Sequence, residues 1–168
     1  MEAISVIVNK ISGIVEKITE LAVVPFTLGF FALTFMGVVT RFVLKVPFVS
    51  SMELSRICFV WFCFLGSSLA YKKSEHIQFT FLKNHLSSRS QKILNVILDL
   101  ISIIFFAVLV RQSIKLNINV STTVFPASGL PLNIMYISLS VMAVFLMIHG
   151  LYFLTKDVAA CMGREGGS

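Results

Sequence analysis

Charged residues are scarce in this sequence of 168 residues, and they stand between long apolar runs. Asp, Glu, Lys and Arg make up 13% of the chain, roughly half the share that is usual in soluble domains. Hydrophobic residues reach 57%, and the mean hydropathy is +0.91. This composition excludes an ordinary water-soluble domain and predicts a single all-α, polytopic membrane domain.

Cysteine and histidine are also few. The three cysteines, Cys58, Cys63 and Cys161, form no CxxC pair, so buried thiols are favoured over a disulfide or a metal site. Of the three histidines only His149 stands clearly inside an apolar run, whereas a haem anchor needs paired axial ligands. The chain also lacks Walker-type and GxGxxG motifs and any nucleophile–His–carboxylate arrangement. We therefore predict no cofactor and no enzymatic activity.

The net charge of +6 does not indicate nucleic-acid binding. Lys and Arg flank the apolar runs, as is usual in membrane proteins, and no basic stripe interleaved with aromatic residues is present. The expected surroundings are membrane lipids and protein partners, with no nucleic acid.

Four apolar runs are long enough to cross a bilayer, which takes about 20 residues in a helix. The predicted spans are 21–44, 54–71, 93–115 and 132–154. Residues 72–92 are predicted to form a partly immersed connector between the second and third spans, and 155–168 form a tail.

The stretch 2–20 repeats isoleucine and valine at the spacing of one helix face, with Glu, Lys and Asn elsewhere. This pattern indicates an N-terminal amphipathic helix lying in the membrane interface. The alternative is that the stretch is the amphipathic start of the first spanning helix.

Basic residues assign a direction to the four spans. Nine of the 14 Lys and Arg residues fall on the side of the two termini and of the 72–92 connector, and five fall on the other side. The positive-inside rule then places both termini and the connector in the cytoplasm.

The second span carries two notable features, and the third span carries one. Glu53 and Arg56 share a helix face near its beginning, as a solvated interfacial ion pair or as a docking pair. A Gly66–Ser68 patch of small residues allows a neighbouring helix to approach closely. Asp99, within the third span, is a functional candidate by its position, although a structural polar contact with Lys72 or Lys73 is favoured over ion coupling.

The order of these residues resembles the small membrane subunit of tripartite ATP-independent periplasmic (TRAP) transporters, the DctQ/SiaQ type. The resemblance rests on an E-x-x-R element, a W-x-x-x-L-G core and a basic end followed by H-I, on an Arg that ends the first span, and on a Pro-containing loop before the fourth. These are Glu53 and Arg56, Trp61, Leu65-Gly66 and Ala70, Lys72-Lys73, Glu75-His76-Ile77, Arg41, and Pro126 to Pro131. The chain departs from the pattern at Thr80, where members often have Asp.

The resemblance implies a subunit of a bacterial inner-membrane, sodium-coupled importer of organic acids, closest to the sialic acid branch. C4-dicarboxylates and sugar acids are the other substrate classes. The partners would be a large elevator-type membrane subunit, for which this chain is the static scaffold, and a periplasmic solute-binding protein. Two other classes stay open: a membrane anchor of a redox enzyme, and a stand-alone small exporter.

The resemblance also implies roles for individual residues. Those expected to contact the binding protein on the periplasmic side are Arg41, Lys45, Glu53 and Arg56. Those expected to pack on the large subunit are Trp61, Gly66, Ser67 and Ser68.

Overall fold

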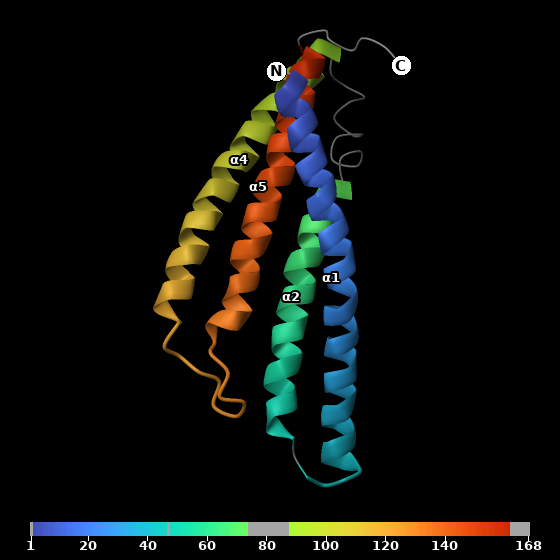
Figure 1. The fold of residues 1–168 in the computed structure, drawn as a ribbon, viewed down its shortest axis with the longest axis vertical. Coiled ribbons are helices and arrows are strands. Elements are labelled where there is room, and N and C mark those ends of the chain that lie inside the picture. The colour runs from blue at the N-terminus through green and yellow to red at the C-terminus, as the bar shows by residue number, and fades with distance from the viewer. Residues whose placement is uncertain (1, 47, 74–87, 162–168) are drawn as a thin grey trace.

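The computed structural model describes residues 2–46, 48–73 and 88–161, and nearly all of them are helical. The helices are α1 (Glu2–Phe42), α2 (Val49–Lys73), α4 (Ser88–Asn119) and α5 (Asn133–Cys161) (Figure 1). All four are long and apolar enough to cross a membrane. The prediction of an all-α protein with four transmembrane helices is confirmed.

The helices form two hairpins that meet along one seam. α1 packs on α2 and α4 packs on α5, and contacts between α2 and α5 join the two pairs. α1 begins and α5 ends at the same end of the bundle (Figure 1). The opposite end, made of residues 41–56 and 117–134, is called the loop end below.

The segment 2–20 is not a separate helix, because α1 runs without interruption through residues 2–42. The structure thus has the arrangement that the sequence left as the alternative, an amphipathic start of the first span. A helix of 41 residues is about 60 Å long, roughly twice the hydrocarbon thickness of a bilayer. Much of its N-terminal half therefore extends beyond a single crossing.

The other helices are longer than the predicted spans, because polar helix ends continue past the apolar runs. α2 includes Lys72 and Lys73, α4 begins at Ser88 within the expected connector, and α5 continues to Cys161 within the expected tail. The partly immersed connector falls largely on residues 74–87, which lie outside the described residues, as do residues 162–168.

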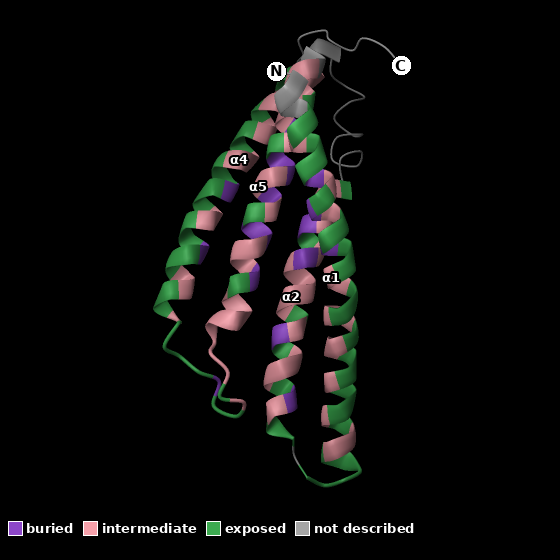
Figure 2. Cartoon of the chain, viewed as in Figure 1, coloured by how far each residue is buried: buried purple, intermediate pink, exposed green. Residues whose placement is uncertain are grey.

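Small hydroxyl side chains line the interior of the bundle. Among the most buried residues are Ser12, Thr19, Ser51, Ser68, Ser113 and Ser138, and buried positions lie where α2 and α5 face each other (Figure 2). Four of these six hydroxyls donate to a carbonyl three or four residues earlier in the chain, such as Thr19 to Val15 at 2.7 Å. Small residues allow close helix packing, which is the usual device in a membrane, where apolar burial gives little driving force.

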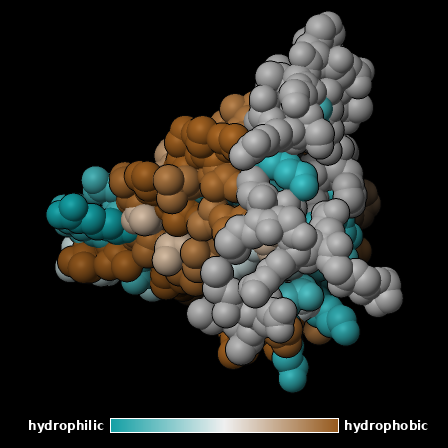
Figure 3. Space-filling view, turned by 90° about the horizontal axis from the view of Figure 1, so that it is seen from above, coloured by the Kyte–Doolittle hydropathy of each residue, from teal (hydrophilic) through white to brown (hydrophobic). Residues whose placement is uncertain are grey.

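Large apolar side chains instead cover the outside. α1 and α4 expose leucine, isoleucine, valine and phenylalanine along most of their length, and hydrophobic surface dominates the described part of the molecule seen from above (Figure 3). Such a surface is stable only against lipid or against another membrane protein.

The N-terminal half of α1 turns its small residues inward. Ser12, Val15 and Thr19 are buried, whereas Ile11 and Ile18 are exposed. The isoleucines of the apolar face predicted from periodicity are therefore directed away from the rest of the chain, whereas Val15 of the same face packs inward. These isoleucines remain available to lipid or to a partner.

Candidate functional site

The loop end gathers the cations that the sequence analysis selected. Arg41 lies in the last turn of α1, and Arg56 is the eighth residue of α2. Lys45 lies between the helices in a left-handed conformation, with φ of 54°. All three side chains are exposed, so three of the four predicted contact residues are accessible at one end of the bundle.

Glu53, the fourth predicted contact residue, faces its own chain. Its Oε1 accepts a hydrogen bond from the main-chain N–H of Ala127 at 3.0 Å, and its Oε2 accepts one from the N–H of Ser128 at 2.7 Å. Ser50, one helical turn earlier, donates its hydroxyl to the carbonyl of Ala127 at 3.0 Å. The start of α2 is thus bonded to the loop that connects α4 and α5.

That loop is itself ordered by main-chain hydrogen bonds. The N–H of Phe125 donates to Leu130 at 2.8 Å, and the N–H of Gly129 donates to Phe125 at 2.9 Å. Gly129 has φ of +69°, a conformation that glycine adopts without steric cost. Phe125 is 4% exposed and anchors the turn in the bundle.

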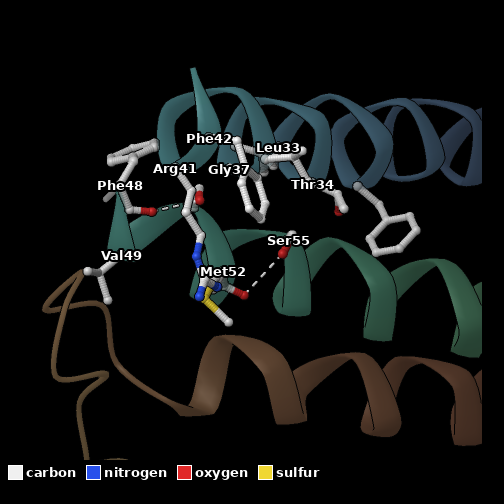
Figure 4. A pocket seen from close by; sticks show the side chains of 12 residues that line it. Leu33, Thr34, Gly37, Arg41, Phe42, Phe48, Val49, Met52 and Ser55 are labelled. Carbon is white, nitrogen blue, oxygen red and sulfur yellow. Dashed lines mark hydrogen bonds between the residues drawn. The ribbon is translucent and has the colours of Figure 1, made fainter. Parts of the chain in front are cut away.

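A cavity of about 600 Å³ opens between α1 and α2 at the loop end. The two helices approach each other closely at two of its lining residues, because a Cβ atom built on Gly37 would come within 2.8 Å of Ser51 Oγ. Arg41 extends from α1 toward Met52 of α2 (Figure 4). The lining is otherwise mainly apolar: Phe30, Leu33, Thr34, Gly37, Val38, Phe42, Phe48, Val49, Ser51, Met52 and Ser55.

Trp61 holds three helices together. Its indole stacks on Phe26 of α1, with ring centres 5.1 Å apart and planes 9° from parallel. Its Nε1–H donates to the carbonyl of Ile134 at 3.0 Å, at the beginning of α5. The residue predicted to pack on a large subunit therefore makes these contacts within its own chain.

The patch of small residues on α2 is divided between inside and outside. Ser68 is fully buried in the bundle, Gly66 is half-buried, and Ser67 is exposed, with its hydroxyl donated to Cys63 at 2.8 Å. Of the three, Ser67 is the residue best placed to meet another protein.

Lys72 and Lys73, which were expected to contact Asp99, each make contacts with other residues. Lys73 pairs with Glu20 of α1 at 2.7 Å, and the Lys72 ammonium lies 3.2 Å from the centre of the Tyr152 ring, a cation–π contact. Within the described residues, Oδ2 of Asp99 is buried without a hydrogen-bond partner.

Sequence reasoning missed the partner of His149. The Oγ of Ser12 lies 2.8 Å from Nδ1 of His149, and both side chains are fully buried. A signal was present in the small-residue spacing of Ser12 and Thr19 on one face of α1. Within the residues that the structure describes, no three His, Cys, Asp or Glu side chains gather as metal ligands.

Comparison with known proteins assigns this arrangement to a family. The family model described as "Tripartite ATP-independent periplasmic transporters, DctQ component" matches residues 30–160, which include α2, α4, most of α5 and the whole loop end.

Individual relatives agree with the family match. A Haemophilus influenzae protein provisionally named TRAP transporter small permease protein is 29% identical over 129 residues, covering 76% of this chain and 80% of the relative. The sialic acid TRAP transporter small permease protein SiaQ of Vibrio cholerae is 31% identical over 87 residues, which are 52% of this chain and 49% of SiaQ.

A larger permease is also similar. The sialic acid TRAP transporter permease protein SiaT of Haemophilus influenzae is 24% identical over 122 residues, which are 73% of this chain and 20% of SiaT. These relatives are named as transporter permeases, which confirms a transport component rather than an enzyme. The chain belongs to the DctQ family, the small permease components of tripartite ATP-independent periplasmic transporters.

Proposed function

We propose that this chain is the static membrane scaffold of a sodium-coupled importer of organic acids that depends on a periplasmic binding protein. The observation that carries the proposal is the similarity both to small permeases and to one-fifth of the longer permease SiaT. Sialic acid is the favoured substrate, because SiaQ and SiaT are named for it. A C4-dicarboxylate or a sugar acid is the alternative.

The internal contacts suit a scaffold that keeps its shape while a partner moves. Trp61 connects α1, α2 and α5, and Ser12 and His149 connect α1 to α5. The exposed apolar faces of α1 and α4 offer the surface on which a large permease and lipids pack.

The charge distribution supports one orientation in the bacterial inner membrane. With both termini in the cytoplasm, the loop end faces the periplasm, and Arg41, Lys45 and Arg56 project toward the space in which a soluble binding protein delivers its solute. The exposed cations favour a partner with acidic surface residues, which speeds encounter and fixes orientation.

A reconstitution tests this function. The chain is co-expressed with its large permease and purified in mild detergent, and the complex is placed in proteoliposomes with an inward sodium gradient and the purified binding protein. We expect co-purification of the two membrane subunits, and uptake of labelled sialic acid only when all three proteins and sodium are present. Uptake that persists without this chain or without the binding protein would contradict the proposal, and labelled C4-dicarboxylates and sugar acids assign the substrate class.

A further inference from the structure

The carboxylate of Glu53 is fully engaged with the chain's own backbone. Each of its two oxygens accepts one N–H of the loop, from Ala127 and from Ser128. Hydrogen bonds between an ionised carboxylate and two successive backbone N–H groups are stronger and more directional than neutral ones. The side chain is therefore oriented toward the loop.

The turn that Glu53 holds is exposed to solvent and has little else to fix it against α2. Pro126, Ala127 and Gly129 are exposed, whereas Phe125 is buried. Phe125 anchors the base of the turn, and Ser50 adds one bond to Ala127. The bonds from Glu53 and Ser50 thus decide how the tip of the turn lies relative to α2.

The contact between Glu53 and the turn also makes the accessible surface of the loop end more cationic. Residues 41–56 and 117–134, which form the loop end, contain three basic residues, and Glu53 is their single acidic residue. Because its charge is directed into the turn, the surface that a partner meets consists of an exposed neutral turn and three exposed cations, Arg41, Lys45 and Arg56.

We propose that Glu53 is a positioning residue that presents the 126–129 turn to the partner and does not itself touch that partner. The partner is a soluble protein whose contact face combines acidic side chains with a neutral centre that covers the turn. This inference rests on the docking role under "Proposed function", and it changes the part that Glu53 takes in docking from contact to support.

The position of the turn is measured without transport. In a background with Cys58, Cys63 and Cys161 replaced by alanine, the pair Ser50→Cys and Ala127→Cys is joined by a short bis-methanethiosulfonate reagent, and the rate of cross-linking is followed by a gel shift. Adding Glu53→Ala should lower that rate about tenfold, and Glu53→Gln should give an intermediate rate, because its amide group replaces one acceptor by a donor. Glu20→Gln, which removes an exposed carboxylate from the Lys73 ion pair, is the matched control and should leave the rate unchanged.

The consequence for docking is measured on the complete complex in proteoliposomes, by varying the concentration of binding protein. Glu53→Ala should raise the half-saturating concentration about tenfold with the maximal rate retained, and cross-linking the 50 and 127 positions in that variant should restore it.

Three outcomes would count against these proposals. A cross-linking rate that does not respond to Glu53→Ala overturns the positioning role. A loss of docking that the cross-link fails to restore also overturns it, because Glu53 would then contact the partner directly. Transport that does not respond to binding protein in the parent complex refutes the docking function instead, and leaves the cross-linking result to decide on Glu53.

Discussion

Ser12 and His149 form a buried contact across 137 positions of the sequence, with Oγ and Nδ1 2.8 Å apart. It joins the N-terminal half of α1, which extends beyond a single membrane crossing, to the C-terminal half of α5. Thr19 and Val15 are buried along the same face of α1. The segment that the sequence indicated as a separate interfacial helix is thereby held as a continuation of the first span.

Ser12→Ala should weaken this packing. It leaves a buried histidine with neither ring nitrogen bonded within the described residues, because Nε2 already lacks a partner there. We expect a loss of about 1–3 kcal/mol in the free energy of unfolding, the usual effect of an unsatisfied buried polar group. The measurement is thermal or denaturant unfolding in detergent, with Ser67→Ala at an exposed position as control. Equal stability of the two variants would contradict the prediction.

Trp61 is expected to stabilise the folded chain through two contacts that can be removed separately. Trp61→Phe retains an aromatic ring against Phe26 but loses the hydrogen bond to Ile134, so stability should fall by about 0.5–1.5 kcal/mol. Trp61→Leu loses the stacking as well and should fall further. Detergent unfolding curves compare the two variants, and no difference between them would show that the stacking contributes nothing.

The two glycines Gly37 and Gly66 should respond oppositely to alanine. At Gly37 the new Cβ would lie 2.8 Å from the buried Ser51 hydroxyl, and overpacking of this kind costs about 1–3 kcal/mol. At Gly66 no side-chain or neighbouring-helix atom lies within 4 Å of the position that the new Cβ would take. Alanine in a helix is favoured over glycine by about 0.5–1 kcal/mol. Unfolding midpoints in detergent should therefore fall for Gly37→Ala and rise or stay equal for Gly66→Ala.

Charge reversal at Arg41 or Arg56 should weaken uptake in cells and leave the membrane complex assembled. Both side chains are exposed at the loop end, where an acidic partner would be repelled instead of attracted. A like charge on the rim of an interface acts mainly on the association rate, and its effect is reduced by salt. Uptake assays at two ionic strengths measure the weakened uptake, and co-purification of the large permease measures whether the complex is assembled. Wild-type uptake in both variants would refute a docking role for these arginines.

Asp99 is predicted to be structural. Asp99→Asn keeps a polar group of the same shape and removes the charge, so sodium-driven uptake should be retained. Asp99→Leu removes every hydrogen-bonding atom and should lower the yield of assembled complex. If Asp99→Asn abolishes sodium dependence in a fully assembled complex, the carboxylate takes part in coupling and the structural role is wrong.

Hydropathy along the chain was sufficient to predict the number and order of the spans. Backbone groups in a bilayer must be satisfied within the helix itself, so a run such as Ile93 to Val110 has one stable arrangement whatever surrounds it. The side of the membrane on which the connecting segments lie was inferred from Lys and Arg, and it stays a prediction. The candidate cations Arg41, Lys45 and Arg56 are exposed at one end of the bundle, because charge near a helix end stays in water, and their role in docking stays a prediction.

Contacts between helices were decided by the tertiary structure. Periodicity identified a face of isoleucine and valine on α1. Its isoleucines Ile11 and Ile18 are exposed, and Val15 packs inward together with Ser12 and Thr19, since in lipid small side chains and close approach drive packing. Glu53 was expected to contact a partner beside Arg56, and the structure turns it toward the backbone of residues more than 70 positions away. The sequence alone determined which segments cross the membrane, because that depends on local composition. Which side chains those segments offer to one another, and which they leave for a partner, depends on how the two hairpins fit.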